Sequence, residues 1–297
     1  MKRTHFIKLL AATPLAAAAM NLSDLNKLSS GFEKTNRLPV LFVGHGNPMN
    51  ALLDNPFTQS LRKTGEYLRS NYRINAILVV SAHWLTKGSF VQASTAPETI
   101  HDFGGFPQEL FDAQYNAPGS PEYAIEVPKL APTVKTTTDW GLDHGAWTIL
   151  MHLFPKADIP VFQLSIDYYD KPMDYHYKLA QQLKALRERG VLVIGSGNVV
   201  HNLRMSMEAL QKGNDTFVYD WATEFDTWVG EKLSKGDYAS LTDYGKAGNA
   251  GLLSVPTPDH YIPMLYSLGM TNPGEEFINT YEELTFGGIS MRTFKIG

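Results

Sequence analysis

Four of the nine histidines in this chain lie where an apolar run ends and the backbone is about to turn. Three of these runs are typical of strands, and the carboxyl ends of parallel strands meet at one edge of a sheet. Imidazole is the commonest metal ligand among protein side chains, so the pattern predicts a metal site. The four candidate ligands are His45 in LPVLFVGHGNP, His83 in AILVVSAHW, His201 in VLVIGSGNVVHN and His260 in VPTPDHY.

Small residues precede the first three of these histidines. Gly44 and Ala82 stand directly before the first two, so no bulky neighbour obstructs either imidazole. Gly195 and Gly197 precede the third. Glycine can adopt the positive φ that would turn the chain toward the strand ends.

The fourth candidate, His260, stands beside a predicted helix. Thr257, Pro258 and Asp259 predict a cap before a helix over residues 261–268, which places His260 in the first turn. The positive end of a helix disfavours a protonated imidazole, so this ring is expected to stay neutral and able to coordinate. The alternative is a surface residue that caps the helix.

A further histidine has the setting of an acid or base. His144 in GLDHGAW precedes a predicted helix and could accept a proton from a substrate hydroxyl, with Asp143 or a neighbour fixing its tautomer. Its alternative is a helix-entry residue without chemistry. The segment HDFGGFP, which begins with His101 and Asp102, predicts a loop whose phenylalanines could close over a flat substrate. Such residues are also common in inert loops.

A structural role competes with each of these assignments. A single histidine beside an apolar run is more often a hydrogen-bonded structural residue than a metal ligand. Three histidines at equivalent strand ends favour joint ligation over that alternative. His5, His152 and His176 have no comparable setting, and we expect them to be structural.

From Leu38 onward, strand-like and helix-like segments alternate. This order predicts an α/β fold with a mostly parallel central sheet flanked by helices. The runs that predict strands buried on both faces cover residues 38–43, 76–81, 159–166 and 191–194. The segments that predict helices cover residues 56–71, 121–130, 146–154, 174–189 and 218–233.

Composition narrows the class of protein. With 297 residues, 43% of them hydrophobic, the chain can bury a full core as one large domain or two packed lobes. A net charge of -4, without a basic cluster past the first few residues, gives no electrostatic footprint for nucleic acid and favours a small-molecule partner. The absence of cysteine leaves histidine, aspartate and glutamate as the strong metal ligands.

Residues 1–37 are predicted to be a signal peptide and linker. Lys2, Arg3 and Lys8 precede the short apolar run LLAATPLAAAAM, the order found in secretory signals. The run is too short to span a bilayer. The sequence therefore favours export to the periplasm, and the alternative is an N-terminal extension on a cytoplasmic protein.

Several strings together resemble the bacterial 4,5-DOPA extradiol dioxygenase family, in the class III extradiol superfamily that also holds protocatechuate 4,5-dioxygenase. They appear in family order and cover residues 38–297, which the resemblance makes one catalytic domain. The strings are GHGNPMNAL, SAHW, TIHDFGGFP, YNAPGSPE, DHGAW, QLSID, SGNVVHNL and VPTPDHYIPMLY.

The resemblance implies roles for individual residues. His45, His83, His201 and His260 match the histidines at the metal, and His144 matches the histidine that lines the substrate pocket and assists proton transfer. In the protocatechuate relatives a glutamate completes a two-histidine, one-carboxylate set on ferrous iron. A histidine stands in that place here, so one divalent ion, Fe(II) or Zn(II), is implied.

The implied reaction is cleavage of a catechol ring, such as that of 4,5-DOPA, beside its two hydroxyls, with O2 as co-substrate and a muconate semialdehyde as product. His144 and His201 are the candidate bases for the second catechol proton. A base cannot be a permanent tight ligand, so the double role of His201 is a hypothesis. Two rival functions are a zinc-dependent hydrolase and a metal-binding or interaction module without catalysis.

Overall fold

Strands that alternate with helices build the fold. In this computed structural model, which describes residues 34–211 and 217–297, a six-stranded sheet has the order β6-β2-β8-β1-β12-β9. The first four strands run parallel to one another, and β12 pairs antiparallel with both β1 and β9. The predicted α/β class with a mostly parallel sheet is confirmed. The strands are β1 (Val40–Gly44), β2 (Ala76–Ser81), β6 (Val161–Gln163), β8 (Val191–Gly197), β9 (Phe277–Tyr281) and β12 (Thr293–Ile296).

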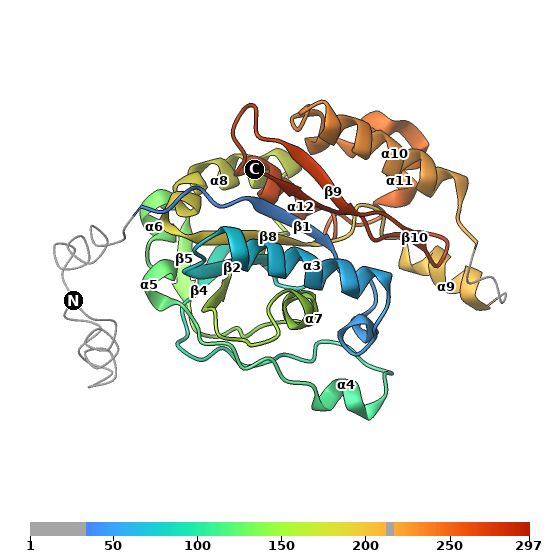
Figure 1. The fold of residues 1–297 in the computed structure, drawn as a ribbon. Helices are drawn as coiled ribbons and strands as arrows, with labels where there is room; N and C mark the ends of the chain where they lie inside the picture. Colours follow the sequence, from blue (N-terminus) through green and yellow to red (C-terminus); the bar gives the residue numbers. More distant parts are fainter. Residues whose placement is uncertain (1–33, 212–216) are drawn as a thin grey trace. The chain divides into compact units, whose positions relative to one another are not determined.

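Helices cover both faces of this sheet (Figure 1). The helices α3 and α7 pack on the face that carries Leu41, Val79 and Ile194, whereas α8 and α12 pack on the other. The α-helices are α3 (Pro56–Asn71), α4 (Gln108–Asp112), α5 (Pro121–Ala124), α6 (Val127–Leu130), α7 (His144–Leu153), α8 (Met173–Gln182), α9 (Leu203–Gln211), α10 (Asp220–Ser234), α11 (Gly248–Ser254) and α12 (Ile262–Gly269).

Short elements complete the described chain. The small strands form three separate pairs, in which β3 lies beside β7, β4 beside β5, and β10 beside β11. Their bounds are β3 (Leu85–Thr86), β4 (Ser89–Gln92), β5 (Val134–Thr137), β7 (Ile166–Asp167), β10 (Leu284–Thr285) and β11 (Ile289–Ser290). The 3-10 helices are η1 (Pro48–Ala51), η2 (Lys184–Arg189), η3 (Ser240–Thr242) and η4 (Tyr244–Ala247).

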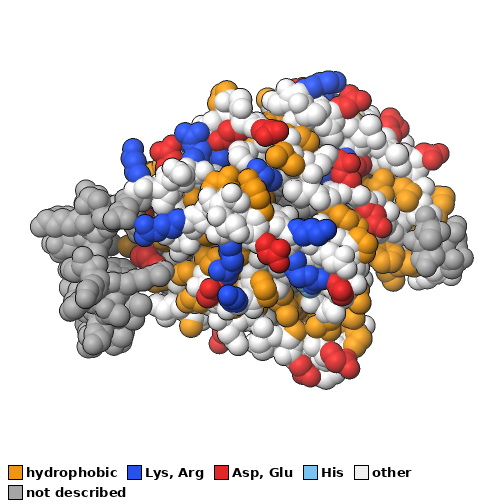
Figure 2. Space-filling model, viewed as in Figure 1, with side chains coloured by type: hydrophobic (Ala, Val, Ile, Leu, Met, Phe, Trp, Pro, Cys, Tyr) orange, Lys and Arg blue, Asp and Glu red, His pale blue; other side chains and the backbone are white. Residues whose placement is uncertain are grey.

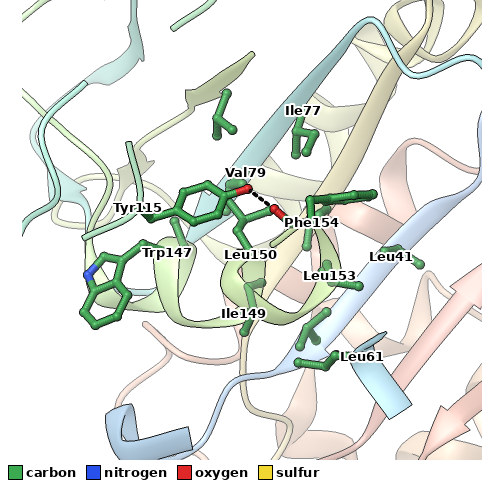
Figure 3. Packing of buried hydrophobic residues seen from close by; sticks show 14 of the residues in the cluster. Leu41, Leu61, Ile77, Val79, Tyr115, Trp147, Ile149, Leu150, Leu153 and Phe154 are labelled. Atoms are coloured by element: carbon green, nitrogen blue, oxygen red, sulfur yellow. Dashed lines mark hydrogen bonds between the residues drawn. The ribbon is translucent and has the colours of Figure 1, made fainter. Parts of the chain in front are cut away.

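The apolar core lies between the sheet and the pair α3 and α7. Leu150 of α7 points toward Val79 of β2, and Trp147 and Leu153 of the same helix belong to the same buried cluster (Figure 3). The hydroxyl of Tyr115 donates a hydrogen bond to the carbonyl of Phe154 at 3.0 Å (Figure 3). The buried hydroxyl of Tyr115 therefore has an acceptor at the end of α7. This bond and the apolar packing hold in place the helix that begins with His144.

Three predicted elements are each divided into two shorter ones in the structure. The single helix predicted over 121–130 is two short helices, because Pro128 lacks an amide donor and begins a new turn in α6. The strand predicted over 159–166 is confined in the sheet to β6 and is followed by the separate short strand β7. The long helix predicted over 174–189 ends at Gln182, and the 3-10 helix η2 follows it.

Strand β8 is longer than predicted, and its glycines have a different role. Gly195 and Gly197 lie inside the strand, and neither has a positive φ. A Cβ on Gly195 would lie 2.3 Å from the carbonyl oxygen of Pro263, and one on Gly197 would lie 2.1 Å from that of His260. Glycine is required there because the segment leading into α12 packs directly on the strand.

The predicted signal segment lies, up to residue 33, outside the described residues. The end of the predicted linker is attached to the fold, because Thr35 donates to the carbonyl of Glu188 and the guanidinium of Arg37 contacts the carboxylates of Glu188 and Glu275. Among residues 34–211 and 217–297, no helix is long and apolar enough to cross a membrane. On the face shown in Figure 2, acidic and basic side chains are interspersed.

Candidate functional site

The register of three parallel strands brings their carboxyl ends level. Strand β8 lies between β2 and β1, with Ser196 opposite Ser81 and Gly197 opposite Gly44. The amide of His45 donates to the carbonyl of Gly197 at 3.0 Å, which extends this pairing past the end of β1. As a result the Nε2 atoms of His45 and His83 lie 3.3 Å apart.

Hydrogen bonds fix the orientation of the His45 ring. Its Nδ1 lies 3.0 Å from the hydroxyl of Ser196, and that hydroxyl donates to the carbonyl of Gly145 at 2.5 Å. Because the proton of Ser196 is used in this way, the hydroxyl oxygen accepts from Nδ1–H of His45. The lone pair of His45 is therefore on Nε2, which faces His83.

Carboxylates hold the Nδ1 atoms of the other two rings in this group. Nδ1 of His83 lies 3.5 Å from Oδ2 of Asp102, and Nδ1 of His260 lies 2.5 Å from Oδ2 of Asp259. Histidines that bind metals typically donate their second ring N–H to such an acceptor, which leaves the other nitrogen as the ligand. One candidate ligand atom from each of His45, His83 and His260 lies within 4.8 Å of the others.

The position of His260 differs from the prediction. Helix α12 begins at Ile262, with Tyr261 as its N-cap, so His260 lies in the turn before the helix and not in its first turn. Amides of the next two residues donate to the carbonyl of Pro258 and close this turn. Burial, rather than the helix dipole, is the main reason that this ring stays neutral.

The electrostatics of the group favour neutral imidazoles. Burial, reinforced by the neighbouring rings, lowers the pKa of His45 and of His260 well below the ordinary value of histidine. Burial also lowers the pKa of His83 to about 3, against the opposing charge of Asp102. At neutral pH all three rings therefore offer a lone pair, as metal coordination requires.

His201 lies at the side of this group. Its ring stacks on that of His260, with centroids 3.5 Å apart and planes inclined by 6°. It shares a second possible ligand group with Asp259 and His260, but not the one with His45 and His83. Burial lowers the pKa of His201 to about 4. The structure thus brings three of the four predicted ligands together and places the fourth beside one of them.

His144 adjoins the same group from α7. Its ring centroid lies 3.8 Å from that of His83 and 5.9 Å from that of His45. Phe103 from the predicted aromatic loop meets the ring edge-on at 5.5 Å. The carboxylate at its Nδ1 is that of Asp102, at 2.9 Å.

Asp143 has a different task from the one suggested for it as the partner of His144. It is the N-cap of α7, and its fully buried carboxylate accepts hydrogen bonds from the hydroxyl of Ser81 at 2.6 Å and the side-chain amide of Gln163 at 2.7 Å. These bonds join the start of α7 to the ends of β2 and β6. The next residue but one, Gly145, is required because a Cβ there would lie 2.5 Å from the Ser81 hydroxyl and 2.8 Å from the His83 ring.

A metal ion fits the donor set. Nitrogen ligands on a tetrahedral ion, at about 2.0–2.1 Å from it, are separated by about 3.3–3.4 Å. The 3.3 Å between the Nε2 atoms of His45 and His83 matches this separation. Two neutral imidazoles with lone pairs facing each other repel unless a cation or proton lies between them. A cation is the better fit because three rings converge and the Nδ1 atoms of His45 and His260 already have hydrogen-bond partners.

A cavity of about 490 Å³ opens next to the site, although His45, His83 and His260 do not line it themselves. Both His201 and Asp259 line it, so it reaches the group through the residues that contact His260. Its other walls come from the start of α9 and from α11 and the segment after it. They include Asn202, Leu203, Arg204, Leu252 and Thr257.

Three supporting residues had no assigned role in the sequence. Ser196 gave no signal, because its contact with His45 depends on the pairing of β8 with β1. The sequence pattern predicts a helix cap at Asp259 and a loop position at Asp102, and neither prediction indicates a contact with an imidazole. Asp259 directly precedes His260 in the sequence, and this adjacency is the signal that indicates a carboxylate able to accept the second ring N–H of a metal ligand.

Comparisons with known proteins agree with this geometry. The model of the family described as the catalytic LigB subunit of aromatic ring-opening dioxygenase matches residues 38–286. A 4,5-DOPA dioxygenase extradiol of Escherichia coli K12 is 44% identical over 269 residues, which cover 89% of this chain and 96% of that protein. One of Beta vulgaris is 38% identical over 77% of this chain and 85% of its own length.

A solved structure shows the same architecture. The crystal structure of an uncharacterized protein from Escherichia coli K12 has a TM-score of 0.73 and 39% sequence identity, and the match covers 88% of this chain and 100% of that one. The family match and the structural match therefore agree with each other. The chain belongs to the family of aromatic ring-opening dioxygenases.

Proposed function

We propose that this protein is a metal-dependent extradiol dioxygenase that opens the ring of a catechol such as 4,5-DOPA with O2 and releases a muconate semialdehyde. The observation that carries the proposal is the convergence of neutral His45, His83 and His260, with His144 at their edge and with a cavity lined by His201 and Asp259 next to His260. The relatives named for this activity support the substrate class.

His45, His83 and His260 would hold one divalent ion. A ferrous ion in this place supplies the redox chemistry that lets the diol and O2 react, which zinc cannot supply because it has no accessible redox change. The all-nitrogen donor set accepts either ion. We therefore propose Fe(II) as the catalytic metal and Zn(II) as a competing occupant.

The side chains around the ion bind the ring and take its protons. Nδ1 of His144 faces Asp102, so Nε2 carries the lone pair that accepts a proton from a catechol hydroxyl. His201 lies outside the group of three and is the candidate acceptor for a second proton. Phe103, edge-on to His144, provides an apolar wall for the flat substrate and excludes water from one side.

The test is oxygen-dependent turnover by protein of defined metal content. Protein loaded with Fe(II) without oxygen is expected to consume one O2 for each catechol and to form a yellow semialdehyde, whereas zinc-loaded protein binds the catechol without turnover. Ester hydrolysis by zinc-loaded protein with no oxygen uptake by the iron form would instead indicate a hydrolase. Metal binding with neither reaction would indicate a module without catalysis.

The cavity supports an anionic substituent on the catechol. Two charged residues line it, Arg204 and Asp259. Asp259 is already bound to His260, whereas Arg204 has a loose contact of 3.7 Å with Glu208 on its own helix and is 82% exposed. A guanidinium at the cavity edge favours a carboxylate on the ring substituent, as DOPA carries.

Replacement of Arg204 by alanine is expected to raise KM for DOPA about two- to fivefold, the effect of one exposed ion pair. A catechol with an uncharged methyl substituent in place of the amino-acid side chain is expected to keep its KM. The matched control is Lys178→Ala, which removes an exposed cation that also pairs with a carboxylate four residues away on a helix. Equal changes in KM for both catechols would contradict a carboxylate subsite.

A further inference from the structure

One carboxylate contacts three donors of the site at once. Oδ1 of Asp102 accepts the backbone amide of His144 at 2.9 Å. Oδ2 lies 2.9 Å from Nδ1 of His144 and 3.5 Å from Nδ1 of His83. Nδ1 of His144 is buried and makes no hydrogen bond of good geometry among the described residues, and the carboxylate of Asp102 is the charged group that approaches it.

The backbone that carries Asp102 is attached to the segment that carries His144. The amide of Ile100 donates to the carbonyl of Leu142, and the amide of Leu142 donates to the carbonyl of Glu98, both at 2.7 Å. The indole of Trp147 donates to the carbonyl of Ile100 at 2.9 Å. The backbone directly before Asp102 is therefore held in place. The two glycines that follow in the aromatic loop are open, because a Cβ added at either would meet no atom within 4 Å.

We propose that Asp102 is the positioning residue that sets the tautomer and ring orientation of His83 and His144 together. Both rings are held with Nδ1–H toward one carboxylate, so both present Nε2 to the reaction space. This inference rests on the proposed function, because it assigns one ring to the metal and the other to proton transfer. It adds that metal binding by His83 and proton transfer by His144 both depend on Asp102.

The arrangement also joins loop closure to the chemistry. Phe103 follows Asp102 directly and packs edge-on against the ring of His144. Displacement of this part of the loop would remove the aromatic wall and the carboxylate in one movement. The histidines are held in the reactive tautomer only when the wall over the substrate is in place.

The same three residues could instead be ligands of a cation, since their ligand atoms lie within 4.8 Å of one another. The contacts favour positioning. Oδ1 is already bound by the amide of His144, and both imidazole Nδ1 atoms approach the single oxygen Oδ2. Two N–H groups that approach one carboxylate oxygen are attracted to it without a cation, whereas two lone pairs would need one.

The test is Asp102→Asn, which keeps the shape and removes the charge. An asparagine cannot accept from both the backbone amide and the rings, so its NH2 must face one of these donors. With the iron-loaded protein we expect kcat to fall about 10- to 100-fold, the usual cost of losing such a partner, with KM for the catechol changed less than about threefold. One metal ion per chain is expected to remain at saturating metal.

A second readout does not depend on turnover. A nitro-substituted catechol changes colour on ionisation, so its spectrum on the zinc-loaded protein reports how far its hydroxyls have lost their protons. At a fixed pH we expect less ionised ligand on Asp102→Asn than on the original protein. This measurement distinguishes the inference from the proposed function, because it holds even where no ring cleavage occurs.

Two further variants complete the experiment. Asp102→Glu keeps the carboxylate and is expected to recover part of kcat and of the ionised spectrum, and it replaces the asparagine variant if that protein fails to fold. Asp112→Asn removes an exposed carboxylate at the end of α4, bound to Gln108, and is expected to change neither readout. An unchanged kcat and spectrum in Asp102→Asn, or loss of the metal at saturation, would overturn the proposal.

Discussion

Replacement of His45 by alanine is expected to remove the metal and to lower kcat by at least about a thousandfold, since the ion contributes several kcal/mol to the reaction. His45 is buried, its Nε2 lies 3.3 Å from that of His83, and Ser196 fixes its tautomer. Pairing of β1 with β8 holds the backbone at this position, so the chain is not expected to shift to supply another ligand. The measurement is metal content after dialysis, together with oxygen uptake.

The control must separate loss of a ligand from loss of a buried ring. His176 is fully buried in α8, contacts the hydroxyl of Tyr266 at 3.1 Å and belongs to none of the possible ligand groups found among the described residues. His176→Ala is expected to lower the melting temperature while one metal ion per chain and turnover at low temperature remain. Full metal content in His45→Ala would show that the ion lies elsewhere.

Replacement of His144 by alanine is expected to lower kcat about 10²- to 10⁴-fold, the contribution of a positioned general base, while the metal remains bound. The ring lies beside His83 but is absent from the group formed by His45, His83 and His260. Added imidazole is expected to restore part of kcat, because the substitution leaves a space of its own size. The measurements are single-turnover rates and metal content.

The His201→Ala variant, measured in parallel, determines whether proton transfer is shared. If His144 is the main acceptor, the loss of kcat in His201→Ala is smaller than in His144→Ala. If His201 is instead a permanent ligand, its replacement lowers metal content as well. Loss of metal from His144→Ala itself would contradict its assignment as a base and make it a ligand.

Strand ends were the part of the site that sequence could predict. His45 and His83 each follow a buried strand by one or two residues, and a parallel sheet places such residues at one edge whatever the loops do. The prediction is weaker for His201, which comes four residues after β8, because the path of the intervening turn decides where the ring lies. The structure places that ring against His260 rather than against His45.

Contacts between distant segments were beyond the sequence patterns. Asp102 reaches His144 because residues 98–102 pair with the segment before α7, and no local pattern encodes that pairing. The glycines of β8 show the same limit. Glycine in a sequence indicates either a positive φ or a close approach, and only the packing of residue 260 on the strand distinguishes them.

Breaks within elements were missed for a local reason. Apolar spacing continues through Pro128, so the pattern predicts one helix where the missing amide divides two. None of these breaks touches the strand ends or α7. The errors in element length therefore left the prediction of the site's location intact.

The packing of His260 against strand β8 determines when during synthesis the group of three histidines can form. The first two rings come from the beginning of the domain and the third from near its end, where the chain passes over Gly197. A partly synthesised polypeptide lacks that last ring. The complete set of three imidazoles is therefore available to one metal ion only after almost the whole chain has been synthesised.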